Sequence, residues 1–227
     1  MNNFDEHERT LVQILQKLFL DNEVSTQLVF KGGTCLMFFY DLDRLSTDLD
    51  FDVRHGIKSL NTDKISEAVS AYLTIEDQRE KYHTYFWNGK YQKGLHGIKV
   101  EVSKRDFPQK IVIKNFLGVN IATLAPEQML AHKLAALSDR NKNRDLYDSN
   151  FMLEKNWNID DEIIKARAGM ETKEYLQTII DKLEKNHDSI QKFILNDLGG
   201  MLNQARRDWV RKNLLDSLKR QLLIRTR

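Results

Sequence analysis

Three aspartates alternate with apolar residues over a short stretch of the chain. Asp48, Asp50 and Asp52 occupy every second position, separated by Leu49 and Phe51. Side chains two positions apart on a β-strand lie on one face, so Asp48 and Asp50 can bind a common cation. Carboxylate oxygens are ligands that Mg²⁺ prefers, and two-metal phosphoryl transfer requires them to converge. The pattern predicts a metal site at Asp48 and Asp50, with Asp52 at its margin; the alternative is a half-exposed edge strand.

A pair of glycines precedes the aspartates. Gly32 and Gly33 stand between an apolar stretch at 27–30 and an apolar stretch at 34–40. Glycines let the backbone approach an anion closely, and a helix beginning at Thr34 would direct its N-terminus at the same anion. Two glycines alone most often make an ordinary turn. Their position between a strand and a helix, followed by the acidic residues, favours a phosphate-binding loop.

The elements that must position these residues follow from the apolar spacing. Helices are predicted at 7–20, 34–40 and 59–73, and a strand at 27–30 runs into the glycines. Further strands are predicted at 48–53, 81–87, 98–102, 111–113 and 119–122, with a turn region containing Gly89, Gly94 and Gly97 after the second of these.

The pattern changes near residue 125, because only helical spacing follows. Pro126 stands where helices often begin, and Gly199-Gly200 is predicted to break the last part. Later helices are predicted at 143–154, 160–168, 172–185 and 201–223. The predicted fold class is therefore α+β: a mixed sheet flanked by helices in a domain at 1–125, followed by a C-terminal helical domain at 126–227.

Composition limits the classes of protein to consider. The chain has 227 residues, 41% of them hydrophobic and 30% charged, which is typical of a globular protein with its own core. The single cysteine, Cys35, excludes an intrachain disulfide and suits a reducing compartment. The N-terminus is polar and acidic, and no apolar run approaches the roughly 20 residues that span a bilayer. These features predict a cytoplasmic protein without a membrane segment.

The glycine and aspartate segments together resemble a known signature. Lys31-Gly32-Gly33-Thr34 followed by Arg44-x-Ser46-x-Asp48-x-Asp50 is similar to the AbiEii/AbiGii-type nucleotidyltransferases, toxins of bacterial type IV toxin–antitoxin and abortive-infection systems. That family lies within the DNA polymerase β-like nucleotidyltransferase superfamily. A second match is Lys133 followed by Arg144-Asp145-x-x-Asp148, which resembles the late motif of the family. The two matches span residues 31–148.

The resemblance implies a nucleotidyltransferase fold and transfer from an NTP that depends on Mg²⁺ or Mn²⁺. It implies a third metal ligand, for which Glu101 at the centre of strand 98–102 is the candidate; the alternative is a cross-strand partner for Lys99 or another surface lysine. The implied catalytic residues are Asp48, Asp50, Glu101, Lys133 and Asp148, and the first three are the implied metal ligands. The implied nucleotide-binding residues are Gly32, Gly33, Thr34, Arg44, Ser46, Lys133 and Asp145.

The acceptor is less well defined by the residues. Arginines and lysines line the helix predicted at 201–223, and this face can follow an RNA backbone or form an ordinary solvated surface. Relatives add nucleotides to tRNA 3′ ends, so the resemblance implies tRNA or another RNA as acceptor and an antitoxin encoded nearby. The alternatives are transfer to a protein or a small molecule, or a non-catalytic NTP-binding protein that acts within a partner complex.

Overall fold

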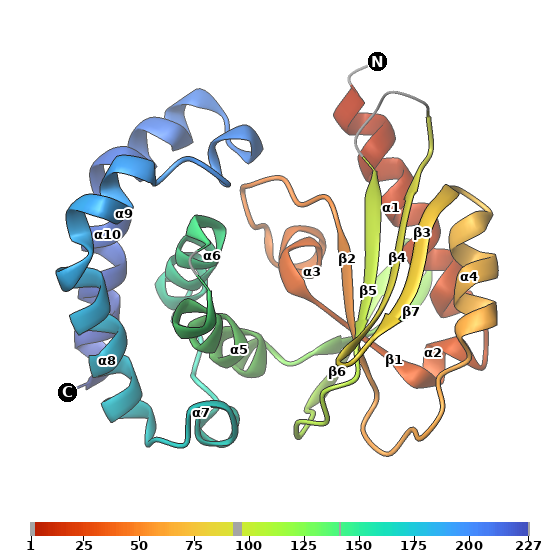
Figure 1. Ribbon diagram of the computed structural model, residues 1–227, viewed down its shortest axis with the longest axis horizontal. Coiled ribbons are helices and arrows are strands. Elements are labelled where there is room, and N and C mark those ends of the chain that lie inside the picture. Colours follow the sequence, from red (N-terminus) through yellow and green to blue (C-terminus); the bar gives the residue numbers. More distant parts are fainter. Residues whose placement is uncertain (1–2, 93–96, 141, 227) are drawn as a thin grey trace. The chain divides into compact units, whose positions relative to one another are not determined.

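The computed structural model describes residues 3–92, 97–140 and 142–226, so Gly94 of the predicted turn lies outside the described residues. The chain divides into two compact units (Figure 1). The sheet unit comprises Met1–Asp41 and Ser46–Ala125, and the helical unit comprises Leu42–Leu45 and Pro126–Arg227. Four residues that lie shortly before the aspartate segment therefore belong to the helical unit.

The sheet unit is built on a seven-stranded sheet with the order β3-β4-β5-β2-β1-β7-β6. The central strand β2 is antiparallel to β1 and parallel to β5, which confirms the predicted mixed sheet. The strands are β1 Leu28–Lys31, β2 Leu49–Val53, β3 Thr74–Lys81, β4 Thr84–Lys90, β5 Ile98–Ser103, β6 Ile111–Phe116 and β7 Val119–Leu124. The helices of this unit are α1 Asn3–Leu20, α2 Val24–Gln27, α3 Gly32–Tyr40 and α4 Thr62–Ser70.

The two faces of the sheet have different partners. Helices α1 and α4 cover one face, and α3 lies on the other (Figure 1). The apolar stripe of α1 is fully buried, as are the alternate β5 residues Ile98, Val100 and Val102. The intervening β5 residues, Lys99 and Glu101, project to the opposite face because strand side chains alternate. On β5, the apolar residues therefore lie on the packed face, and Glu101 lies on the opposite face.

The sequence pattern predicts one strand at 81–87, but the structure has a hairpin there. Strand β3 ends at Lys81, the chain turns at Tyr82-His83, and β4 begins at Thr84. Strand β3 consists almost entirely of polar, solvent-accessible residues, so it carries no apolar alternation that could reveal it. The prediction was correct for residues 84–87, which lie in β4, but it missed β3, because this edge strand is defined by its pairing with β4 rather than by burial.

The helical unit contains no strand within its described residues. Its helices are α5 Pro126–Asp139, α6 Asn143–Glu154, α7 Asp161–Ala168, α8 Thr172–Lys185, α9 His187–Phe193 and α10 Gln204–Thr226, with a 3₁₀ turn at Gly199–Met201. The long helix α10 packs on α6 and α8 through buried side chains such as Leu214 and Leu218. Among the described residues, no helix is long and apolar enough to cross a membrane.

Candidate active site

Strand register brings the predicted carboxylates to one part of the sheet unit. Asp50 of β2 stands beside Glu101 of β5 and, on its other side, beside Lys31 of β1. Directly paired residues on neighbouring strands project from the same face, at a strand spacing of about 4.8 Å. Glu101, which is far from the aspartates in sequence, is therefore their neighbour in the fold.

Helix α3 begins at the glycines and is fixed to the segment that leads into β2. The Thr34 hydroxyl lies 2.5 Å from the carbonyl oxygen of Asp48 and 2.9 Å from Ser46 Oγ. A carbonyl oxygen can only accept, so Thr34 donates to Asp48 and accepts from Ser46. Thr34 is fully buried, and its side chain serves this connection. The backbone N–H groups of the first helical turn have no partner within the helix and remain the groups suited to an anion.

Glycine is required at position 32 by the neighbouring Asp50 side chain as well as by the backbone conformation. Its φ is +85°, and a Cβ atom on it would lie 2.4 Å from Asp50 Oδ2 and 2.8 Å from Asp50 Cβ. Such distances are shorter than any van der Waals contact. The glycine therefore allows the Asp50 carboxylate to rest against the start of α3.

Gly32→Ala is expected to displace Asp50 and abolish any activity that depends on the Asp50 carboxylate. The left-handed backbone adds a cost of about 1–2 kcal/mol to folding. Gly56→Ala is the matched control, because Gly56 has the same φ of +85° and a Cβ atom on it would have nothing within 4 Å. Thermal unfolding and activity are measured for both variants. Equal activity in Gly32→Ala and Gly56→Ala would contradict the role assigned to the Asp50 contact.

Two lysines compensate two of the three aspartates. Asp52 is 5% exposed and forms an ion pair of 2.5 Å with Lys31. Asp48 accepts a hydrogen bond from the backbone N–H of Lys99 at 3.4 Å, and the Lys99 ammonium lies 3.9 Å from it. Lys99 therefore pairs with Asp48 rather than with Glu101. Within the described residues, neither Asp50 nor Glu101 forms an ion pair with a basic side chain.

The Glu101 carboxyl lies in a setting that disfavours its charge. Its pKa is raised by burial and by the negative charge of Asp50, with a smaller contribution from Asp48. Hard oxygen donors that repel one another are the donor set a divalent cation neutralises. In the described part of the chain, however, no three His, Cys, Asp or Glu side chains stand close enough together to hold a metal ion. The donor chemistry suits Mg²⁺, while a complete protein-only cage is not formed.

The remaining predicted residues form a charged cluster inside the helical unit. The Lys133 ammonium of α5 lies 3.0 Å from Asp145 and 2.6 Å from Asp148, which share one face of α6. Arg44 binds Asp148 through two parallel hydrogen bonds of 2.6 and 2.7 Å. Arg140 binds Asp145 at 2.8 Å. Residues from three separate segments thus meet around two carboxylates that are fully buried.

The charged forms of these side chains are stabilised by their partners even though the side chains are buried. Burial alone would raise the pKa of Asp148, but Arg44 and Lys133 outweigh it and lower that pKa to about 2. Burial alone would lower the pKa of Lys133, but Asp148 and Asp145 raise it. The cluster therefore remains fully ionised at neutral pH.

Arg44 uses all of its guanidinium nitrogens within the helical unit. Besides Asp148, its Nη1 donates to the carbonyl oxygen of Leu45 at 2.8 Å and contacts the Met201 sulfur at 3.6 Å. Asp43 accepts a hydrogen bond of 2.5 Å from the Tyr147 hydroxyl. Segment 42–45 is thus held by α6 through both Asp43 and Arg44. The sequence motifs mark Arg44, but nothing in them indicates that its partner is Asp148, more than 100 residues away.

Comparison with known proteins identifies the family. The model of the nucleotidyl transferase AbiEii toxin family of type IV toxin–antitoxin systems matches residues 13–222. The chain belongs to this family. This confirms the resemblance drawn from the glycine, aspartate and lysine motifs. No curated protein sequence matches the chain.

Solved structures share the fold of this AbiEii-family chain. A putative nucleotidyltransferase from Helicobacter pylori is 22% identical, with a TM-score of 0.60 over 99% of this chain and 98% of that one. JHP933 from H. pylori is 21% identical, with a TM-score of 0.57 over 99% and 95%. The nucleotidyltransferase toxin MenT4 from Mycobacterium tuberculosis is 15% identical, with a TM-score of 0.50 over 96% and 91%. These similarities confirm the predicted fold class.

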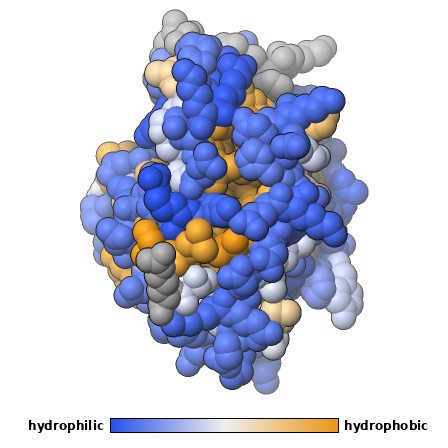
Figure 2. Space-filling view, turned by 90° about the vertical axis from the view of Figure 1, so that its left-hand side faces the viewer, coloured by the Kyte–Doolittle hydropathy of each residue, from blue (hydrophilic) through white to orange (hydrophobic). Residues whose placement is uncertain are grey.

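The basic helix predicted as an RNA surface is α10, and most of its cations contact their own chain. Arg206 pairs with Asp43, and Arg207 donates to the carbonyl oxygens of Gly199 and Leu202 at 2.7 and 3.0 Å. Arg211 pairs with Asp208, and Lys219 with Glu184. These contacts use most of the charge of α10 within the chain. Figure 2 shows one face of the molecule, on which hydrophilic residues surround an apolar patch.

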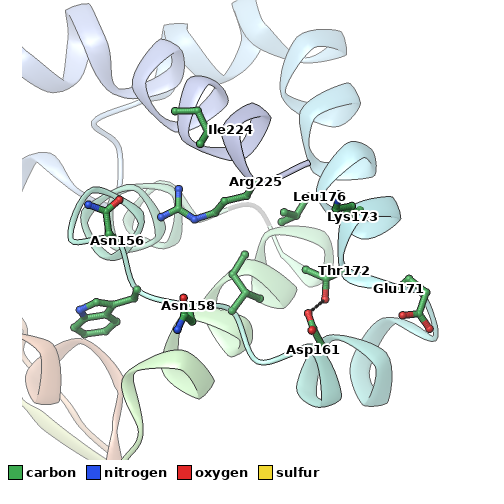
Figure 3. Close-up of a pocket in the computed structure, with 11 residues that line it drawn as sticks. Asn156, Asn158, Asp161, Glu171, Thr172, Lys173, Leu176, Ile224 and Arg225 are labelled. Atoms are coloured by element: carbon green, nitrogen blue, oxygen red, sulfur yellow. Dashed lines mark hydrogen bonds between the residues drawn. The ribbon is translucent and has the colours of Figure 1, made fainter. Parts of the chain in front are cut away.

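The helical unit also contains a pocket with a volume of about 720 Å³. Asn158 and Arg225 project toward it, and Leu176 and Ile224 supply apolar surface (Figure 3). The Arg225 guanidinium is held by the carbonyl oxygens of Leu153 and Gln221. None of the predicted site residues lines this pocket.

Proposed function

We propose that this AbiEii-family protein is a metal-dependent toxin that transfers a nucleotide from an NTP to the 3′ hydroxyl of an RNA such as tRNA, with release of pyrophosphate. The observation that carries the proposal is the pair Asp50 and Glu101, which stand side by side on the sheet without an ion pair among the described residues. Asp50 also lies against the start of α3 at Gly32. Neighbouring carboxylates next to an anion-binding helix terminus suit a cation and a triphosphate together.

The sheet unit would supply the metal and phosphate ligands. Asp48, Asp50 and Glu101 would hold Mg²⁺ or Mn²⁺ only together with oxygens of the nucleotide, because in the described part of the chain these carboxylates do not by themselves stand close enough to hold an ion. When bound, the ion neutralises phosphate charge and favours ionisation of the attacking hydroxyl. Backbone N–H groups at Gly32 and Gly33 receive the phosphates. The hydroxyl oxygen bonds to the α-phosphorus, its proton passes to Glu101, and the bond to the β-phosphate breaks to release pyrophosphate.

The helical unit would supply a cation for the triphosphate. Lys133 is the proposed contact, because an ammonium on a flexible stem suits a phosphate. Its side chain is 15% exposed, and Asp145 and Asp148 orient it. We assign Arg44 and Ser46 to positioning: both are engaged by the protein and fix the segment that leads to Asp48. The proposed partners are an NTP, an RNA acceptor and an antitoxin.

Transfer is tested with each radiolabelled NTP, Mg²⁺ and total tRNA. The wild-type protein is expected to label RNA with one or more nucleotides, to release pyrophosphate, and to lose both activities with a chelator. Asp48→Ala is the inactive control. Label found in protein or in a small molecule would replace the RNA acceptor with the corresponding alternative. If no NTP labels any acceptor, the transferase proposal fails and a non-catalytic NTP-binding role becomes the better description.

A further inference from the structure

The register row that contains the carboxylates continues toward the free edge of the sheet. Glu101 of β5 is paired with Phe86 of β4, and Phe86 is paired with Arg79 of β3. The adjacent row places Lys81 of β3 opposite Thr84 of β4. Paired residues share a face, so Arg79 and Lys81 project from the same face as Glu101. A carboxylate, an aromatic ring and two cations follow one another across three strands.

The ring of Phe86 holds both cations in place. The Lys81 ammonium lies 4.2 Å from the ring centroid, and the Arg79 guanidinium carbon lies 5.4 Å from it. Phe86 itself is 7% exposed, whereas Arg79 and Lys81 are exposed. Cations over an aromatic face are attracted to it, and this reduces the freedom they would lose on binding a ligand.

The two cations differ in how far they are already neutralised. Arg79 pairs with Asp77 at 2.5 Å. Lys81 has no ion pair in the part of the chain that the structure describes. Its ammonium lies over the Phe86 ring of β4, the strand between β3 and the strand that carries Glu101. Lys81 is therefore the group on this face most available to a ligand anion.

We propose that Lys81, with Arg79 and the supporting Phe86, forms a track that binds the phosphate backbone of the single-stranded 3′ end of the acceptor RNA beside Glu101. This inference rests on the proposed transferase function, because it takes the attacking hydroxyl to lie at Glu101. Strands β3 and β5 are two strand spacings apart, about 10 Å. A phosphodiester that precedes the terminal nucleoside falls within that span. Backbone contacts of this kind carry no base specificity.

Charge favours RNA over a protein acceptor at this track. A hydroxyl on a protein side chain brings no phosphate for Lys81, whereas every RNA 3′ end brings one next to its terminal nucleoside. The other basic candidate, α10, has most of its cations bound to its own chain. The two cations of the track lie on β3, and the supporting Phe86 lies on β4, the strand next to the candidate catalytic carboxylate on β5.

The test measures binding of a fluorescent single-stranded oligoribonucleotide with a free 3′ hydroxyl, in Mg²⁺ without NTP, over a range of salt concentrations. Lys81→Ala is expected to weaken binding about fivefold to tenfold and to reduce the slope of log K against log salt by about 0.7, the value for one phosphate contact on a single strand. Lys81→Arg is expected to keep the affinity and the salt dependence of the wild type. Lys104→Ala is the matched control: Lys104 lies 5.0 Å over the ring of Tyr85, on the other face of β4, and pairs with Glu80.

Each outcome decides between the track and its alternatives. If RNA is bound and labelled but Lys81→Ala binds it as the wild type does, the track is overturned and the transferase proposal stands. An equal loss in Lys104→Ala would mean a general charge effect and would also overturn the track. If the wild type binds no RNA and labels protein instead, the track and the RNA acceptor are both overturned, and transfer to protein replaces them. Circular dichroism and NTP binding show whether each variant is folded. Arg79→Ala is a second test of the track, with a smaller expected loss of RNA binding than Lys81→Ala.

Discussion

Asp148→Asn is expected to lower the free energy of unfolding by about 3–5 kcal/mol, the cost of removing one partner from a buried ion pair. The Asp148 side chain is fully buried, and the substitution leaves Arg44 and Lys133 facing a neutral amide of the same shape. Urea unfolding measures the change. Asp208→Asn is the control, because Asp208 is half exposed and pairs with Arg211 at 3.4 Å, so it should cost less than about 1 kcal/mol. A similar small loss in both variants would contradict a structural role for the cluster.

The Asp148 carboxylate also determines how the difference in stability between the wild type and Asp148→Asn depends on pH. In the folded protein the pKa of Asp148 is lowered from 3.8 to about 2. As pH falls, the unfolded chain therefore takes up this proton first, and the stabilisation is complete above the ordinary pKa and lost by about pH 2. Between these values the stability curves of the wild type and Asp148→Asn should converge. Curves that stay parallel would show that Asp148 does not contribute through its charge.

Asp50→Asn is expected to reduce nucleotide transfer by about 10³-fold, since a metal ligand supports several kcal/mol of transition-state stabilisation. Its melting temperature should stay unchanged or rise. Asp50 forms no ion pair among the described residues, and its negative charge repels that of Glu101. Labelled-NTP transfer, Mg²⁺-dependent NTP binding and thermal unfolding are measured together.

Asp52→Asn provides the contrast on the same strand. Asp52 is buried against Lys31, so its loss should lower stability while reducing transfer less than Asp50→Asn does. A marked fall in melting temperature for Asp50→Asn, equal to that of Asp52→Asn, would indicate that Asp50 is structural and would remove the main support for the metal site.

Local periodicity accounts for what the sequence could predict. The alternation of Asp50 and Asp52 with apolar residues predicts the strand that the structure has at Leu49–Val53. The predicted helices at 143–154 and 172–185 agree with α6 and α8, because each has a regular apolar stripe. The same spacing indicates that Asp145 and Asp148 share a face, and both lie against Lys133.

Long-range pairing accounts for what the sequence could not predict. Strand β3 carries no apolar signal, so Arg79 and Lys81 could not be placed beside Glu101. Arg44 lies close to Asp48 in sequence, which favours a phosphate contact, but its guanidinium is fully engaged at Asp148. Gly32 suggests close approach of an anion, and the structure adds the Asp50 side chain as a second reason for it.

Segment 42–45 has a consequence for how the protein can be divided. The chain leaves the sheet unit after Asp41, contributes four residues to the helical unit, and returns at Ser46, two residues before Asp48. The polypeptide therefore passes between the units three times, at 41–42, 45–46 and 125–126. No single cut separates them, and a fragment ending at residue 125 would carry Arg44 without its counter-ion. Separate expression of the two units would therefore require the chain to be re-joined around segment 42–45 rather than simply cut.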